Sequence, residues 1–136
     1  MTYLVDANVL SEATRPDPNV AVLDWLRRHE PDLVVDPIVL GELRFGILLL
    51  PRGRRRTRLE RWFAHGAERI ACVAWDAETG LRWAALLARL RQSGRAMPIK
   101  DSLIAASALR HDLVVVTRNR RDFAAAGVRM LDPFAQ

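Results

Sequence analysis

Short segments rich in valine, leucine and isoleucine alternate with longer segments of helical periodicity along the whole chain. The clearest short segment, LVVVT at residues 113–117, contains three consecutive valines. Strands of a parallel sheet have this composition because helices bury both faces of the sheet. The alternation therefore predicts an α/β fold of three layers, with a central parallel sheet of about five strands flanked by helices. A length of 136 residues suits one core, so we expect a single domain over residues 1–136.

The expected elements place polar residues at one edge of this sheet. We expect strands at residues 2–5, 33–35, 69–73, 113–117 and 128–131, and helices at residues 19–28, 38–50, 54–64, 77–91 and 101–110. Ligands of such a sheet bind beyond the carboxyl ends of the strands. Asp6 follows the first strand, and Asn119 and Asp122 follow the strand at residues 113–117. These side chains should therefore lie close together.

Two further acidic residues stand in apolar surroundings. On a helical wheel with about 100° per residue, Glu42 falls between Ile38, Phe45 and Leu49. Burying a carboxylate without a partner costs several kcal/mol, so Glu42 needs a cation, an arginine or a raised pKa. Asp101 begins the segment DSLIAASALR, which is apolar nearly all round, so this carboxylate should be buried as well.

Each polar residue also has a simpler explanation. Asp6 suits a turn after a strand, Asn8 and Asp101 suit helix N-caps, Glu42 could pair with an arginine, and Asp122 could be an exposed loop acid. Their joint placement favours a metal site, because converging carboxylates repel each other unless a cation lies between them. Oxygen ligands of this kind suit Mg²⁺ or Mn²⁺, as one ion or two.

The composition excludes several other kinds of site. Cys72 is the only cysteine, so no disulfide forms within the chain, and no Cys/His set for structural zinc is present. The three histidines fall at the ends of expected helices, where the helix C-terminus favours a cation. No P-loop motif, signal-peptide pattern or apolar run of about 20 residues occurs. We expect a cytoplasmic protein without a membrane segment.

The basic residues indicate an acidic partner. The formal net charge is +5, and Lys100 is the only lysine among 21 basic residues. Arginine grips phosphate through a planar fork of donors. The segment PRGRRRTRLER carries Arg52, Arg54, Arg55, Arg56, Arg58 and Arg61, and a second group borders the acidic edge at Arg118, Arg120 and Arg121. We expect Arg54, Arg55, Arg56 and the second group to bind nucleic-acid phosphates. A solvated helix face or a protein-binding surface would carry the same charges.

Four ordered motifs resemble those of PIN-domain ribonucleases, and within them the VapC-type toxins of bacterial toxin–antitoxin pairs. The motifs are LVDANVLSE, VLGELRFGI, IKDSLIAASAL and LVVVTRNRRDF, and the resemblance covers essentially the whole chain. It implies that Asp6, Glu42 and Asp101 are catalytic acids that bind metal. At the fourth acidic position, where many relatives carry an aspartate after TR, this chain has Asn119, which would still act in catalysis by holding a metal-bound water through its carbonyl oxygen. Asp122 would partly substitute as a metal ligand.

The same resemblance implies a function. It implies an endoribonuclease that depends on one or two Mg²⁺ or Mn²⁺ ions and hydrolyses RNA with an activated water, leaving a 3′-hydroxyl. Asn8 and Thr117 would support the site, with Thr117 donating a hydrogen bond to Asp6. Arg118, Arg120 and Arg121 would bind RNA beside the cut. A cognate antitoxin would block the site, and the chain would form a homodimer through the helices near residues 38–64.

Two other interpretations remain open at this point. A catalytically weak PIN-fold module could bind nucleic acid through its arginines, and Asn119 favours that option because an amide brings no charge. A receiver-like phospho-accepting domain also places acids at strand ends and a threonine after a later strand. That interpretation lacks an acidic pair after the first strand and an aspartate after the third, which ends near Val73.

Overall fold

A five-stranded parallel sheet lies at the centre of the structure, a computed structural model that describes residues 1–135. Its strands are β1 (Tyr3–Val5), β2 (Leu33–Val35), β3 (Ala71–Cys72), β4 (Val114–Val116) and β5 (Met130–Leu131), in the order β3-β2-β1-β4-β5. Every pairing between neighbouring strands is parallel. All of the predicted strands are present, with bounds within about two residues of those expected. The predicted parallel sheet is thereby confirmed.

The helices of at least eight residues all correspond to predicted ones. They are α2 (Val20–Arg28), α3 (Pro37–Leu48), α4 (Arg54–His65), α5 (Ala77–Gln92) and α6 (Ile99–His111). Two helices of four residues each, α1 (Ala7–Leu10) and α7 (Arg120–Phe123), were not predicted, because one turn is too short to show a period. The 3₁₀ turns are η1 (Ser11–Thr14), η2 (Glu30–Asp32), η3 (Ala67–Arg69) and η4 (Ala124–Ala126).

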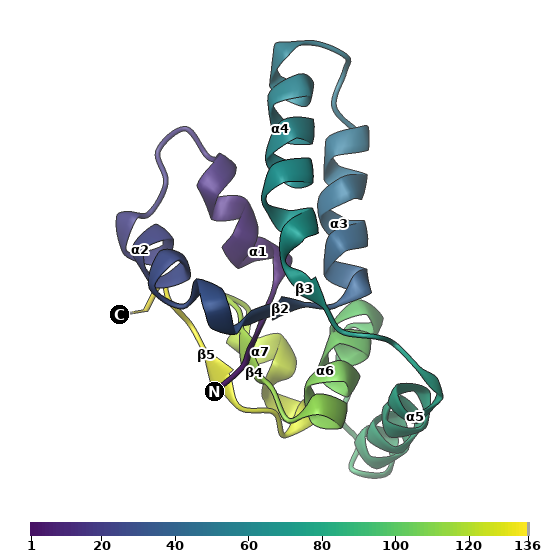
Figure 1. Cartoon of the computed structure of the whole chain (residues 1–136). Coiled ribbons are helices and arrows are strands. Elements are labelled where there is room, and N and C mark those ends of the chain that lie inside the picture. Colours follow the sequence, from purple (N-terminus) through teal and green to yellow (C-terminus); the bar gives the residue numbers. More distant parts are fainter. Residues whose placement is uncertain (136) are drawn as a thin grey trace.

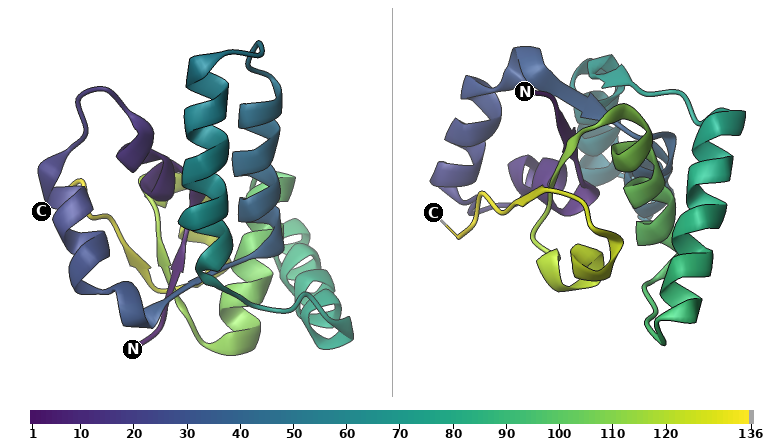
Figure 2. Two further views of the ribbon diagram at one scale, coloured as in Figure 1. Left: turned by 45° about the horizontal axis from the view of Figure 1, so that its top comes forward. Right: turned by 90° about the horizontal axis from the view of Figure 1, so that it is seen from below.

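The helices cover both faces of the sheet. Helices α1 to α4 lie on one side, and α5, α6 and α7 lie on the other (Figure 1). This division follows from right-handed crossovers, because the chain adds β2 and β3 on one side of β1 and then returns to add β4 and β5 on the other. Helices α3 and α4 pack against each other as a hairpin, and α5 packs along α6 (Figure 2). The three-layer α/β/α arrangement is the one predicted.

The sheet has its topological switch between β1 and β4. Leu4, Val5, Val115 and Val116 from these two strands are all fully buried. The crevice of such a sheet forms where the strand order reverses, at the carboxyl ends of the two central strands. Asp6 and Thr117 are the residues that follow these ends. None of the helices within residues 1–135 has the length and apolar character needed to cross a bilayer.

Candidate active site

Asp6 is held at the switch point by hydrogen bonds to both carboxylate oxygens. It is the N-cap of α1, where Oδ1 accepts the backbone N–H of Ala7 at 2.8 Å. Oδ2 accepts the hydroxyl of Thr117 at 2.7 Å and the amide of Asn8 at 3.1 Å. The residue is 4% exposed. The expected hydrogen bond from Thr117 is therefore present, and it fixes the carboxylate in one orientation.

Asn8 and Thr117 join the ends of β1 and β4. Thr117 Oγ1 accepts the backbone N–H of Asn119 at 3.0 Å, and Asn8 Oδ1 accepts the backbone N–H of Arg118 at 3.0 Å. Asn8 lies inside α1 and bonds to Asp6 and Arg118, so it is not a helix N-cap. The loop after β4 is consequently tied to Asp6 through side chains more than a hundred residues apart in sequence.

Asp101 is a buried acid beside other acids. Helix α6 begins at Ile99, so Asp101 lies in the first turn of the helix and is not its N-cap. The residue is 6% exposed, and the pKa of its carboxyl group is raised to about 6. Burial is the largest cause, and the negative charges of Asp6, Asp122 and Glu42 act in the same direction, while the positive charge of Lys100 opposes them. The acids predicted to converge are thus close enough to act on one another electrostatically.

Glu42 faces this group from α3 and pairs with a lysine. Its Oε2 atom lies 2.9 Å from Nζ of Lys100, the residue just before Asp101. The other oxygen, Oε1, is buried and has no hydrogen-bond partner among residues 1–135. The sequence interpretation offered an arginine, a cation or a raised pKa as the solution for this carboxylate. The structure supplies a lysine for one oxygen and leaves the second one free.

The predicted surroundings of Glu42 were wrong in one respect. Phe45 and Leu49, its expected buried neighbours, are 63% and 69% exposed. Helix α3 buries a different face, formed by Val39, Leu43 and Ile47. The helical wheel could not separate the two faces because both are apolar. An apolar strip of α3 thus lies uncovered next to the acidic group.

Next to the fourth acidic position, Asp122 carries the nearest negative charge in the sequence. Asn119 is exposed, and its side chain makes no capping hydrogen bond to α7. Asp122 lies three residues later on α7, is half-buried, and contributes to the raised pKa of Asp101. A single helical turn therefore brings Asp122 back toward the crevice.

Asp36 is a buried acid that the sequence analysis did not identify. It is fully buried at the end of β2 and is the N-cap of α3, where Oδ1 accepts the backbone N–H of Ile38 at 2.7 Å. Oδ2 accepts the hydroxyl of Ser107 on α6, and burial raises the pKa of the carboxyl group. Asp36 thus links the helix that carries Glu42 to the helix that carries Asp101. An aspartate directly before Pro37 was the available sequence signal.

The acidic group has the chemistry of a divalent-cation site. Among the described residues, no three Asp, Glu, His or Cys side chains are already arranged to hold a metal ion. Two of the carboxylates already have partners in the protein: Asp6 accepts a hydrogen bond from Thr117, and Glu42 pairs with Lys100. The free oxygen of Glu42 and the buried, mutually repelling acids nevertheless match what a hard cation binds. Oxygen donors and excess negative charge fit Mg²⁺ or Mn²⁺, and Asp6 and Asp101 are the buried residues that would hold such an ion.

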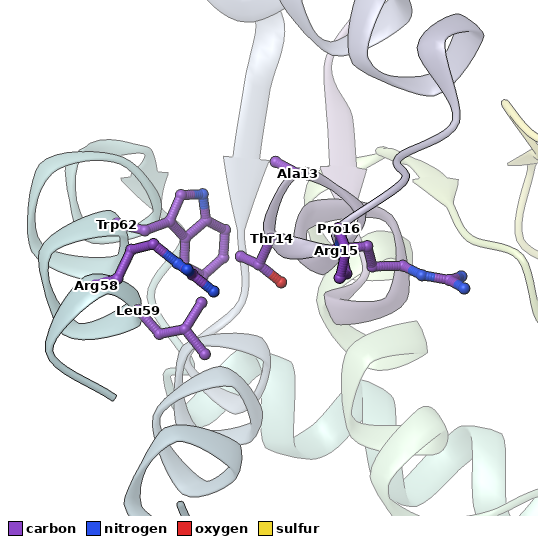
Figure 3. Close-up of a pocket in the computed structure, with 7 residues that line it drawn as sticks. All are labelled: Ala13, Thr14, Arg15, Pro16, Arg58, Leu59 and Trp62. Atoms are coloured by element: carbon purple, nitrogen blue, oxygen red, sulfur yellow. The ribbon is translucent and has the colours of Figure 1, made fainter. Parts of the chain in front are cut away.

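A groove runs from Glu42 along α4. One hollow of about 400 Å³ is lined by Asn8, Glu42, Arg55, Leu59 and Trp62 among others, and a second of about 380 Å³ shares Thr14, Leu59 and Trp62 with it. Figure 3 shows Arg58, Leu59 and Trp62 facing Ala13 and Thr14, while Arg15 points away. We call these two adjoining hollows, which are both bordered by Thr14, Leu59 and Trp62, the groove.

The arginines of α4 differ in their surroundings. Arg55 and Arg58 line the groove. Arg56 is engaged locally, donating to the backbone oxygen of Leu50 at 3.3 Å and lying 3.6 Å from a Glu60 oxygen. Arg54 is exposed and lines neither hollow. Arg118, Arg120 and Arg121 are exposed beside the crevice, and the guanidinium of Arg118 lies 4.4 Å above the ring of Phe134.

Comparison with known proteins assigns the chain to a family. The sequence profile of the PIN domain matches residues 3–128. The chain is a member of the PIN-domain family. Among similar proteins, the plasmid stability protein StbB of Pseudomonas syringae is 37% identical over 96% of this chain and 97% of its own length. The VapC ribonuclease Y4jK of Sinorhizobium fredii is 34% identical over 96% of both chains.

A solved structure confirms the fold. The FitAcB complex of Neisseria gonorrhoeae contains a chain that superposes with a TM-score of 0.89 at 31% identity, covering 99% of this chain and 100% of that one. Membership of the PIN family decides against the receiver-like interpretation. The predicted resemblance to VapC-type toxins is confirmed by these relatives.

Proposed function

We propose that this PIN-domain protein is a metal-dependent endoribonuclease that acts as the toxin of a toxin–antitoxin pair. The observation that carries the proposal is the gathering of Asp6, Glu42, Asp101 and Asp122 at the switch point of the sheet, where burial and the charges of the other three acids raise the pKa of Asp101. Further support comes from the relatives named as VapC ribonucleases and as the toxin FitB. RNA hydrolysis at an acidic site is consistent with a divalent cation that offsets the charge of both carboxylates and phosphate.

Each residue of the site has a separate role in the proposed reaction. Asp6 and Asp101 would hold the ion, with Asp6 kept in orientation by Thr117 and Asn8. When bound, Mg²⁺ or Mn²⁺ polarises the scissile phosphate and makes water a better nucleophile at neutral pH. Glu42 would take the proton of the attacking water at Oε1, the oxygen without a partner. Arg118, Arg120 and Arg121 would hold phosphates next to the scissile one.

A cleavage assay tests the proposal. We expect purified protein with Mg²⁺ to cut total RNA at discrete positions and to leave 3′-hydroxyl ends. Asp6→Asn should reduce the rate about a thousandfold or more, because the ion loses a charged ligand. Mapping the ends produced by both proteins in parallel separates true cleavage from contamination. Equal cleavage by the two proteins would refute the proposed site. RNA binding without cleavage in either would favour the catalytically weak module.

The groove along α4 is the proposed path of the RNA strand. Arg55 and Arg58 line it beside Trp62, and aromatic rings with arginines form common platforms for single strands. We expect the double variant Arg55→Gln, Arg58→Gln to reduce the slope of log K against log salt by about 1.4, since each lost phosphate contact removes about 0.7 for single strands. Filter binding on the Asp6→Asn background measures this slope without cleavage.

A matched control removes the same charge elsewhere on α4. Arg54→Gln with Arg61→Gln changes two exposed arginines that line neither hollow. We expect the salt slope of this control to stay close to that of the parent. If both double variants lower the slope equally, the groove has no special role in RNA binding, and the charge of the helix acts only as a whole.

The proposed partners follow from the relatives and from the exposed apolar strip. The solved relatives include FitAB and VapBC complexes, some of them bound to DNA. We propose that this chain also has a cognate antitoxin, which covers its acidic site. The exposed side chains of Phe45, Leu48 and Leu49 on α3 support a homodimer contact along this helix.

A further inference from the structure

Lys100 occupies an unusual place for a lysine. It is the only lysine in the chain, whereas every other basic position is arginine. It lies in the first turn of α6, where the helix dipole disfavours a positive charge. The stability of the helix therefore does not explain this residue. The neighbours of Lys100 explain it better, because its ammonium group lies 2.9 Å from a carboxylate oxygen of Glu42 and the residue directly precedes Asp101.

The ammonium group makes one ion pair in the site, with Glu42, and its charge also acts on Asp101 and Asp6. The hydrogen bond to Glu42 is the main cause of a raised pKa for Lys100, and the charges of Asp101 and Asp6 add to it. Lys100 in turn favours the ionised form of Asp101, whereas burial and the other acids favour the protonated form. A lysine ammonium is a compact point charge with three donors, so it can offset carboxylates much as a small cation does.

We infer that Lys100 serves as a built-in second cation of the acidic site, so that the chain binds a single divalent ion through Asp6 and Asp101. This inference rests on the proposed function. It gives Glu42 a partner that does not depend on a second ion. It also accounts for an uncharged side chain at position 119, because a site with one divalent ion and one ammonium group needs fewer acidic ligands than a site with two divalent ions.

Titrating Mn²⁺ into metal-free protein and counting the ions bound tests the inference without RNA. By isothermal titration calorimetry we expect one Mn²⁺ per chain for the parent. For Lys100→Met we expect either two ions or one ion bound about tenfold more tightly, because removing a nearby positive charge strengthens cation binding. Lys100→Arg keeps the charge and should resemble the parent. The same count and the same affinity in the parent and in Lys100→Met would overturn the inference, as would two ions in the parent.

Thermal unfolding distinguishes this role from a plain surface ion pair. Without metal, Lys100→Met should unfold about 3 °C or more below the parent, and saturating Mn²⁺ should remove most of the difference. A loss of stability that Mn²⁺ does not restore would mean that Lys100 is only structural. Arg129→Met, which breaks an exposed ion pair of 3.0 Å with Asp112, is the control and should leave Mn²⁺ binding unchanged.

A chemical test uses the fact that the chain has one lysine. Reductive methylation keeps the charge of Lys100, whereas acetylation removes it, and both also modify the N-terminal amine. Only acetylated protein should behave as Lys100→Met does in Mn²⁺ binding, and identical behaviour of the two modified proteins would overturn the inference. Failure of the proposed function would be seen separately, as RNA cleavage that does not depend on Asp6 or as a parent chain that binds no Mn²⁺.

Discussion

Replacing Asp101 by asparagine should abolish RNA cleavage and at the same time stabilise the metal-free protein at neutral pH. Cleavage should fall about a thousandfold or more, because the proposed ion loses one of its two deepest charged ligands. Stability should rise because the ionised carboxylate is buried among Asp6, Asp122 and Glu42. The pair of opposite effects is characteristic of a site whose charges are compatible only when a cation is bound.

The stabilisation should depend on pH in a defined direction. Asp101 has a pKa of about 6 in the folded protein, against an ordinary value of 3.8. The folded state therefore binds the proton more readily than the unfolded state, and the metal-free parent gains stability as the pH falls from about 7 to about 4. Asp101→Asn lacks this contribution. We expect the free energy of unfolding of Asp101→Asn to exceed that of the parent by about 2 kcal/mol at pH 7.5, and by much less at pH 4.5.

Urea unfolding in the presence of a chelator measures both stabilities. Asp17→Asn is the matched control, since Asp17 is exposed in a loop and its replacement should change stability by less than about 0.5 kcal/mol. An Asp101→Asn protein that still cleaves RNA at the parental rate would remove Asp101 from the proposed ligands. If the Asp101→Asn protein is less stable than the parent at pH 7.5, the neighbouring acids do not destabilise the ionised Asp101 as proposed.

Replacing Asp36 by alanine should be the most destabilising of the single substitutions considered. The change removes the N-cap of α3, worth about 1 kcal/mol, and leaves the buried hydroxyl of Ser107 without its acceptor, at about 1–3 kcal/mol. We expect a total loss of about 2–4 kcal/mol in the free energy of unfolding. Denaturant unfolding measures it, and a loss below about 1 kcal/mol would contradict the linking role of Asp36.

Two variants separate the parts of this effect. Asn19→Ala removes the exposed N-cap of α2, which accepts only the backbone N–H groups of Ala21 and Val22, and it should cost only about 1 kcal/mol. Asp36→Asn can keep both hydrogen bonds, with its oxygen accepting from Ile38 and its amide donating to Ser107, so most of the stability should remain. The difference between Asp36→Ala and Asn19→Ala reports the link between α3 and α6.

The sequence by itself determined the elements and the order of the acidic positions. Strands and helices of sufficient length show their period in the residues that they bury, so β4 and α6 could be predicted from local composition. Parallel strands bring their carboxyl ends to one edge, so Asp6 and Thr117 could be expected to meet once the strands were assigned. The motifs around Asp6, Glu42 and Asp101 also carried the resemblance to the PIN family, because they are contiguous in sequence.

Only the tertiary structure decided which partner each polar group has. Lys100 pairs with Glu42, and Asp36 with Ser107, across 58 and 71 residues respectively. The exposed strip at Phe45 and Leu49 and the choice of Arg55 over Arg54 for the groove were likewise invisible in the sequence. Periodicity reports whether a side chain faces inward within its own helix or strand. It carries no information on how α3, α4 and α6 are rotated against one another, and that rotation selects the contacts between them.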